Sequence, residues 1–392
     1  AAAAGVTCLE EAEVRQVERR GGGWRLAGSW QGEPLRLAAD LLLDASGGGF
    51  LSRHLALPAR AAGDELHTSL VFGHFTGAGR FTDAAAAGGA ELPAGPYPEE
   101  QAAVHHLLEE GWMYVLPFDH GTVSAGFVLA TAAARRWLAP LAPERAWEEL
   151  LGRYPTLAAQ FGGARPSRPP GVVPRLQRRG EQAAGGDWAL LPHAFCFWSP
   201  MFSTGIAWSL IAVERLAQLV ESAPDRQSLA CGLDRYGRLL AREADHLHRL
   251  VAGAYLAALR DFDLFAAWSD LYFAAASFAE IRQRLCPEGG EAWAWEGFLG
   301  ATDPLLAVAV ERTLAELRGL CGGAPDEEAR RRFAAGVRRR IAPRNVAGLA
   351  DPARNRLYPV DLGPLIRHPH RVGLSAGELR RRLHRLRGTE TG

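Results

Sequence analysis

Residues 197–205 read Phe-Trp-Ser-Pro-Met-Phe-Ser-Thr-Gly and stand directly before an apolar run that starts at Ile206. Proline, hydroxyl residues and glycine in front of an apolar helix place free backbone N–H groups at its positive end, which stabilises an anion or the electron-rich edge of a ring. The hydroxyl of Ser203 or Thr204 can equally cap this helix without any ligand. The residues alone therefore leave a ligand site and a plain capped helix open.

A second segment, residues 39–49, reads Ala-Asp-Leu-Leu-Leu-Asp-Ala-Ser-Gly-Gly-Gly. Its apolar run to Asp44 is typical of a strand that is buried on both faces. The small residues after that run let a ligand approach the backbone closely, as at the carboxyl edge of a nucleotide-binding sheet. A glycine-rich loop after a strand is as often only a turn, so both interpretations stand.

A third segment, residues 111–117, places Trp112 and Tyr114 two positions apart and hence on one face of a strand. Such a face can line a pocket for an aromatic substrate. Taken by itself, the pattern favours a core or cross-strand stripe instead.

Periodicity and turn residues predict the elements that position these segments. Residues 5–45 alternate short apolar runs with glycine turns, which is typical of an antiparallel meander. Strand patterns return over 66–131, with a Gly/Ala/Pro-rich interruption, and favour a separate, mostly antiparallel sheet; the period beyond 225 is helical almost to 322. The other predicted elements are helices at 143–161, 206–221, 327–340 and 376–387, short strands at 172–176 and 188–191, and a loop-like tail at 343–369.

The composition indicates a soluble globular protein, with 48% hydrophobic and 22% charged residues. Lys plus Arg equals Asp plus Glu at 44 each, so nothing in the net charge favours nucleic acid or an anionic membrane. The chain contains no lysine. The apolar stretch 205–220 carries Glu214 and Arg215 and is expected to be a buried amphipathic helix, not a membrane span. No signal peptide is visible, and we expect a cytoplasmic location.

Metal and hydrolase chemistry are both disfavoured. The five cysteines are scattered and favour buried free thiols over disulfides or a zinc site. His105 and His106 are adjacent and His246 and His248 are two apart, so each pair would diverge on a helix. No Gly-x-Ser-x-Gly nucleophile motif is present.

The three segments together resemble the flavin-dependent halogenase family and its relatives among the FAD-dependent monooxygenases. The family pattern Phe-x-x-Pro-x-x-Ser-x-Gly is matched at every position, by Phe197, Pro200, Ser203 and Gly205. Residues 112–117 match two of the four positions of a second pattern, Trp-x-Trp-x-Ile-Pro. Because two of its four positions differ, this second match is weaker, and it weakens the case for a halogenase relative to a plain monooxygenase.

This resemblance implies an α/β (α+β) fold. Its parts would be a Rossmann-like FAD-binding domain of the p-hydroxybenzoate hydroxylase type, incomplete at the N-terminus, an antiparallel substrate sheet and a C-terminal helical region. The implied division assigns residues 1–65 to the partial FAD-binding domain, 66–185 to the substrate sheet, 186–222 to a return to the FAD-binding domain, and 223–392 to the helical region.

The resemblance also implies site residues. Those expected to bind FAD are Asp44, Ala45, Ser46, Gly47, His193, Pro200, Ser203, Thr204, Gly205 and Ile206. Residues 200–206 would lie beside the isoalloxazine ring, with the halide at the backbone of Thr204 and Gly205. His193 stands where many relatives have an aspartate, and it would bond a ribityl or phosphate oxygen; a loop histidine satisfied within the protein is equally compatible. Trp112, Tyr114 and Phe202 are expected to line the substrate pocket.

The implied activity uses reduced FAD and O2 to halogenate or hydroxylate a small aromatic molecule, with chloride as the halide. FAD would be reduced by a flavin reductase or by an intrinsic NAD(P)H-dependent step. Two alternatives stay open: a reductase of the geranylgeranyl type, and a non-catalytic fragment.

Several departures from the family qualify this hypothesis. No Gly-x-Gly-x-x-Gly turn precedes the meander, so the chain is expected to start late and to hold FAD poorly. Halogenases resemble one another in using a lysine, and this chain contains none. Tryptophan halogenases place a glutamate where this chain has Phe202, so phenol-like, pyrrole-like or carrier-bound substrates are expected instead of free tryptophan.

Overall fold

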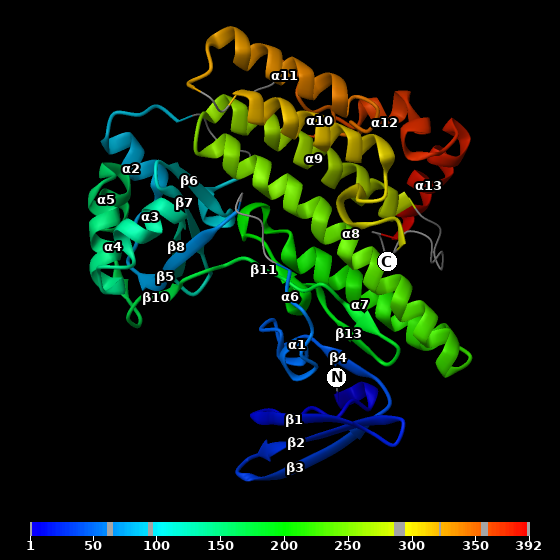
Figure 1. Cartoon of the computed structure of the whole chain (residues 1–392). Helices are drawn as coiled ribbons and strands as arrows, with labels where there is room; N and C mark the ends of the chain where they lie inside the picture. Colours follow the sequence, from blue (N-terminus) through cyan, green and yellow to red (C-terminus); the bar gives the residue numbers. More distant parts are fainter. Residues whose placement is uncertain are drawn as a thin grey trace. The chain divides into compact units, whose positions relative to one another are not determined.

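The computed structural model describes residues 2–60, 66–92, 97–285, 295–320, 323–353 and 360–389 (Figure 1). The chain forms two compact units. The first comprises Ala1–Ala61, Arg178–Leu247 and Cys286–Thr302, and the second comprises Ala62–Gln177, His248–Leu285 and Asp303–Gly392. Each unit is thus assembled from segments that are far apart in the sequence.

The first unit begins with the short 3-10 helix η1 (Ala2–Ala4) and the predicted meander. Strands β1 (Ala12–Arg20), β2 (Gly23–Trp30) and β3 (Glu33–Ala39) pair antiparallel in that order. The first hairpin turns at Gly21 and Gly22, whose φ angles of 62° and 79° suit glycine.

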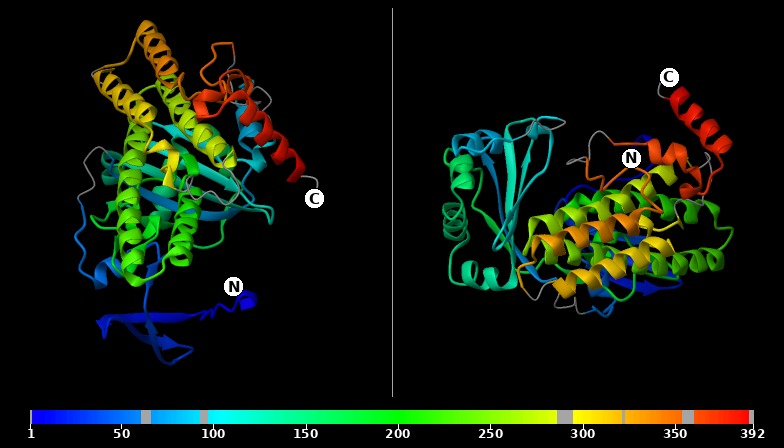
Figure 2. Two further views of the ribbon diagram at one scale, coloured as in Figure 1. Left: turned by 90° about the vertical axis from the view of Figure 1, so that its right-hand side faces the viewer. Right: turned by 90° about the horizontal axis from the view of Figure 1, so that it is seen from above.

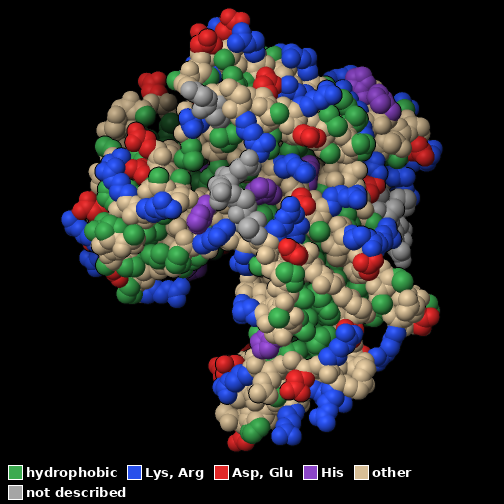
Figure 3. All heavy atoms as spheres, in the orientation of Figure 1, with side chains coloured by type: hydrophobic (Ala, Val, Ile, Leu, Met, Phe, Trp, Pro, Cys, Tyr) green, Lys and Arg blue, Asp and Glu red, His purple; other side chains and the backbone are tan. Residues whose placement is uncertain are grey.

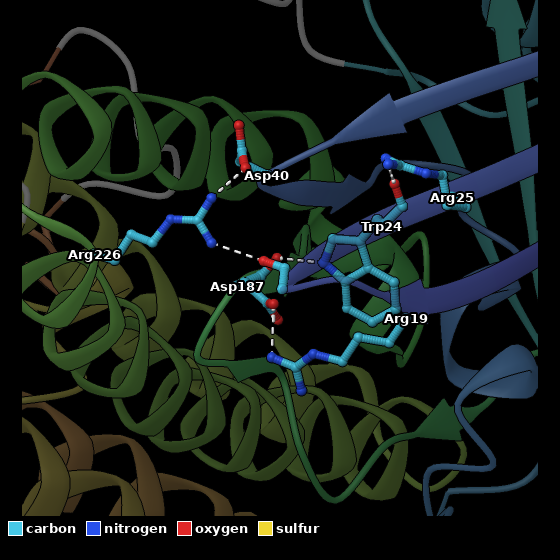
Figure 4. Close-up of polar contacts among 7 residues, drawn as sticks. Arg19, Trp24, Arg25, Asp40, Asp187 and Arg226 are labelled. Carbon is cyan, nitrogen blue, oxygen red and sulfur yellow. Dashed lines mark hydrogen bonds and ion pairs between the residues drawn. The ribbon is translucent and has the colours of Figure 1, made fainter.

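Polar contacts at the base of the meander tie it to the rest of this unit (Figure 4). The buried Trp24 donates its indole N–H to the Asp187 carbonyl at 3.0 Å, and Arg19 donates to the Asp187 carboxylate at 2.6 Å. Arg226, at the start of helix α8 (Arg226–Ala258), pairs with Asp40. These contacts fix the strand that leads into the glycine-rich loop.

The loop follows a shorter strand than predicted. Strand β4 (Leu42–Asp44) pairs in parallel with β13 (Trp188–Leu190), and β13 pairs antiparallel with β12 (Ala184–Gly185). The expectation of a strand over 39–44 buried on both faces is wrong, because the side chain of Leu43 is 44% exposed. Within the described residues, β13 is the only strand bonded to β4, so its other edge is uncovered.

The remaining elements of this unit include those that carry the segment 197–206. They are α1 (Phe50–His54), β11 (Arg178–Arg179), α6 (Pro192–Phe195), β14 (Cys196–Phe197), η3 (Met201–Ser203), α7 (Gly205–Ser222), the part of α8 up to Leu247, and η5 (Phe298–Gly300). The expectation that α7 is a buried helix holds for only one side. Trp208 and Leu216 are buried, whereas Ile206 and Leu210 are 75% and 64% exposed.

The second unit contains the predicted antiparallel sheet. Its strand order is β10-β5-β8-β7-β6, and β9 (Arg165–Pro166) pairs with β5. The strands are β5 (Thr68–Thr76), β6 (Val104–Leu108), β7 (Gly111–Pro117), β8 (Thr122–Ala130) and β10 (Gly171–Val173). Side chains from one face of this sheet, among them Val71, Met113 and Phe127, form a core with Trp147 and Phe161.

Helices cover that face of the sheet (Figure 2). They are α2 (Phe81–Ala87), α3 (Thr131–Trp137), α4 (Pro143–Gly152) and α5 (Pro155–Phe161), with η2 (Glu99–Gln101) nearby in the chain. The single helix predicted over 143–161 is two helices, because Pro155 starts a new one after Tyr154. His105 and His106 lie in strand β6, not in a helix, so they face opposite sides of the sheet.

The rest of the second unit is helical, as predicted. It contains the last turns of α8, then α9 (Phe262–Leu285), α10 (Pro304–Leu320), α11 (Glu327–Ile341), η6 (Pro369–Val372) and α13 (Ala376–Thr389). The tail over 343–369, expected to be loop, includes the short helix α12 (Gly363–Arg367). Trp268 packs so closely on Gly253 that a Cβ there would overlap its ring.

Surface and cysteine properties complete the description. Basic and acidic side chains are interspersed over the face drawn in Figure 3. Among the described residues, none of the helices combines the length and apolar character that a membrane crossing requires. Cys196 is a buried free thiol as expected, but Cys8 and Cys231 are exposed; Cys286 and Cys321 lie outside the described residues.

Candidate functional site

The ring-side turn, defined as residues 197–206, has an unusual backbone. Phe202 and Ser203 adopt φ angles of 67° and 53°, the left-handed region that side chains other than glycine rarely occupy. Each such residue costs about 1–3 kcal/mol, and such strain concentrates at functional sites. Thr204, with φ of −71°, then precedes the first residue of α7.

Thr204 does not cap the helix. Its side chain makes no capping hydrogen bond, although the residue is only 5% exposed. The simple capping interpretation of Ser203 or Thr204 is therefore wrong: neither hydroxyl bonds an amide of α7 within the described residues. Thr204 instead lines a pocket of about 260 Å³. A buried hydroxyl without a protein partner is uncommon and suits a ligand.

His193 packs against the same turn. A Cβ on Gly205 would overlap the Nε2 and Cε1 atoms of the imidazole, so a larger residue there would have to displace the ring. The ring also lies 5.7 Å from that of Phe197, measured between centroids. Burial, and then the nearby Arg178 guanidinium, lower the pKa of His193 below its usual value. The imidazole is therefore neutral near pH 7.

Arg178 joins the two segments that the sequence singled out. Its Nη2 donates to the carbonyl oxygens of both Gly47 and His193. Its guanidinium carbon lies 5.7 Å from the ring centroid of Phe197, and its buried Nε has no partner among the described residues. Sequence reasoning missed Arg178, since the stretch around it is rich in Pro, Gly and Arg and no pattern distinguishes it.

Asp44 shapes the glycine-rich loop. Its two carboxylate oxygens accept the amides of Ser46 at 2.8 Å and Leu51 at 2.7 Å, and its side chain is buried. Both oxygens are thus engaged with the backbone that turns from β4 into α1. Ala45 and Ser46 are exposed beside it. The part of this loop open to a ligand is therefore its backbone and the Ser46 side chain.

A buried ionic cluster supports α7 behind the turn. Arg215 donates to both oxygens of Glu243, at 2.9 and 2.6 Å, and the pair is almost fully buried. Trp208, which lines the pocket, donates its indole N–H to the same carboxylate at 2.7 Å, and the Phe298 amide donates at 2.6 Å. Glu243 therefore holds α7, α8 and η5 together. The sequence gives no local signal for this long-range pair.

Trp112 and Tyr114 lie in the second unit, on β7. Trp112 is 1% exposed and donates its indole N–H to the Tyr255 hydroxyl at 2.7 Å. Its ring lies 4.8 Å from that of His105. Tyr114 is partly buried, and that burial raises its pKa. These contacts are those of a packed cross-strand stripe, and a substrate-lining role for the pair stays a prediction.

The residues of the first unit fit the ring edge of a flavin. The pocket beside Thr204 is lined mainly by apolar side chains, among them Phe197, Trp198 and Pro200. The Thr204 hydroxyl and the start of α7 supply the few donors that such a ring or an accompanying anion requires. Asp44, His193 and the turn belong to one unit, whereas Trp112 and Tyr114 belong to the other.

Comparisons with known proteins identify the family. A family model described as tryptophan halogenase matches residues 1–285. The chain is 29% identical over 200 residues to tetracycline 7-halogenase of Kitasatospora aureofaciens, and 27% identical over 189 residues to monodechloroaminopyrrolnitrin halogenase PrnC of Pseudomonas fluorescens. These matches cover 50% and 46% of this chain, but only 35% and 33% of those proteins.

Solved structures share the fold. Halogenase PltM matches with a TM-score of 0.74 at 21% identity, over 86% of this chain and 70% of that protein. The flavin-dependent halogenase CmlS matches with a TM-score of 0.52 at 16% identity, over 100% of this chain and 57% of that protein. The mixed α/β fold expected from the sequence, with its antiparallel sheet and helical region, is confirmed. The chain belongs to the tryptophan halogenase family of flavin-dependent enzymes.

Proposed function

We propose that this chain carries out FAD-dependent halogenation of a small aromatic molecule, with the halide held at Thr204 and Gly205. The observation that carries the proposal is Thr204, a residue 5% exposed whose side chain makes no capping hydrogen bond within the described residues and which lines a pocket at the start of an 18-residue helix. Reduced FAD together with O2 supplies the oxidising power when the cofactor is bound.

The chain's own residues supply position, dryness and a local positive field. The left-handed backbone at Phe202 and Ser203 leads into α7, whose first residues, Gly205 and Ile206, line the pocket with amides that have no intrahelical partner. Phe197, Trp198 and Pro200 give it apolar walls. Asp44 fixes the loop whose exposed backbone at Ala45 and Ser46 we assign to the adenosine half of FAD. Chloride is the proposed halide.

The substrate is proposed to be phenol-like, pyrrole-like or carrier-bound. Support comes from Phe202, which replaces an acidic residue in the turn, and from the names of relatives. One matched PltM structure is described as a complex with phloroglucinol and FAD, and the two sequence relatives are named for tetracycline and monodechloroaminopyrrolnitrin. Trp112, Tyr114 and Phe202 are the proposed substrate-lining residues. A flavin reductase is the proposed source of reduced FAD.

The test supplies the purified chain with FAD in excess, NADH, a flavin reductase, phloroglucinol and chloride or bromide, and measures products by mass spectrometry. Excess FAD is needed because we expect weak affinity without a Gly-x-Gly-x-x-Gly turn. Halogenated product that requires halide and is lost in Thr204→Val, but not in Ser209→Ala, supports the proposal. Hydroxylated product without halide identifies a monooxygenase, and saturation of a carbon–carbon double bond in an added prenyl substrate identifies a reductase.

Flavin binding is measured in parallel by quenching of FAD fluorescence. Absence of both product and quenching would favour the non-catalytic fragment. Tight, stoichiometric FAD binding would contradict the expectation of weak affinity while leaving the proposed reaction intact.

A further inference from the structure

The imidazole of His193 is built into the ring-side turn. It comes from α6, yet it occupies the space that any side chain on Gly205 would fill. Because residue 205 is glycine, the imidazole ring lies directly on the backbone at the start of α7. His193 also lines the pocket together with Ser203 and Thr204.

The surroundings of this imidazole favour an anion. No aspartate or glutamate is among the residues of the described chain that line the pocket. The first amides of α7 have no acceptor one turn earlier, as at any helix start, and no side chain caps them. The Arg178 guanidinium donates to the backbone carbonyl oxygen of His193, so a positive charge lies near the ring, whose pKa is lowered by burial and then by that charge.

The second and independent sign of a ligand is Thr204. Thr204 is 5% exposed, and its side chain makes no capping hydrogen bond to α7 within the part of the chain that the structure describes, so its hydroxyl is left to the pocket that the residue lines. Thr204, His193 and Gly205 line one pocket, and a hydroxyl, a ring N–H and the amides of a helix start are the kinds of donor that bind a halide ion. Glu243, which accepts the indole N–H of the pocket-lining Trp208, is neutralised by Arg215.

We propose that His193 is a positioning residue for the halide, donating a ring N–H to the ion held at Thr204 and the start of α7. This inference rests on the proposed function, and it adds a residue and a role. His193 would hold the ion against the turn, and Gly205 would be required because a larger residue displaces the imidazole.

The experiment measures chloride binding to the purified chain, without flavin, from the broadening of the chloride-35 NMR line. His193→Ala is expected to weaken chloride binding roughly three- to tenfold, the range for one lost hydrogen bond. His193→Gln keeps an N–H donor and is expected to retain most of the affinity. His120→Ala removes an exposed imidazole from the turn between β7 and β8 and serves as the matched control.

Gly205→Ala provides a second route if His193→Ala fails to fold. Its methyl group overlaps the imidazole, so chloride affinity is expected to fall by a similar factor with residue 193 unchanged. Circular dichroism confirms that each variant is folded.

Three results would overturn the inference. The first is wild-type affinity in both His193→Ala and Gly205→Ala while Thr204→Val loses chloride; this rejects His193 but leaves the proposed halide site. The second is equal loss in His193→Gln and His193→Ala, which makes the effect structural. The third is no chloride broadening by the wild-type chain beyond that of its Thr204→Val variant, which rejects the halide site as well. FAD fluorescence quenching then reports separately on flavin dependence.

Discussion

The ring-side turn and strand β7 both carry residues of family patterns, but they differ in the hydrogen bonding of their buried polar groups and in the regularity of their backbone. In the turn, Thr204 is buried without a capping bond, and Phe202 and Ser203 are in the left-handed region. In β7, Trp112 is buried with its N–H bonded to Tyr255, inside a regular ladder. Satisfied polar groups and regular backbone are what stability alone produces. The contrast indicates that the turn is shaped for a ligand and β7 chiefly for packing.

The largest expected effect tests the packing side of this comparison. Trp112→Ala removes a fully buried indole and leaves the Tyr255 hydroxyl without its donor, so the free energy of unfolding should fall by about 3–5 kcal/mol. Urea denaturation measures the change. Trp30→Ala, at a side chain 37% exposed, should cost far less. Equal small losses in both variants would show that Trp112 is not a packing residue.

An intermediate effect should appear in the pH dependence of stability. His106 is half-buried in the sheet of the second unit, its buried Nε2 has no partner among the described residues, and burial followed by the charge of His105 lowers its pKa to about 4. The unfolded chain binds this proton near pH 6.5. As pH falls from 6.5 toward 4, only the unfolded state is protonated, so stability is complete above pH 6.5 and is lost below it.

The loss due to His106 should be about 2 kcal/mol at pH 5. Urea denaturation at pH 7 and pH 5 measures it, and His106→Leu should show a smaller difference between the two values than the wild type. His120→Leu, at an exposed imidazole, should leave the difference unchanged. If His106→Leu and the wild type lose the same stability, the imidazole is protonated in the folded state and the sheet tolerates a charge there.

Sequence patterns located most elements because local periodicity determines them. The meander, strands β7 and β8, and helix α7 lie where alternation, glycine turns and helical spacing predicted them. Errors arose where tertiary contacts decide. A helix at His105 and His106 was assumed in disfavouring a metal site, whereas pairing with β7 makes that segment a strand.

Only part of the candidate site could be predicted from the sequence. The turn could be found because its residues are contiguous, whereas Arg178 and Glu243 act through contacts that span the chain. Sequence could not decide whether Thr204 caps α7 or faces a pocket, because both outcomes use the same residue in the same place. Only the position of the Thr204 side chain in the fold distinguishes a helix cap from a pocket residue.

The smallest effect tests the ligand side of the comparison. Ser203 has a φ of 53°, which glycine adopts without penalty, so Ser203→Gly should stabilise the fold by up to about 1 kcal/mol. The control Ser209→Gly, in the interior of α7, should destabilise it by about 1 kcal/mol because glycine is a poor helix former. Urea denaturation compares the two. Stabilisation at residue 203 together with weaker chloride binding would mean that the chain retains a strained backbone for the sake of the ligand, whereas destabilisation there would mean that the turn is held by contacts of the serine itself.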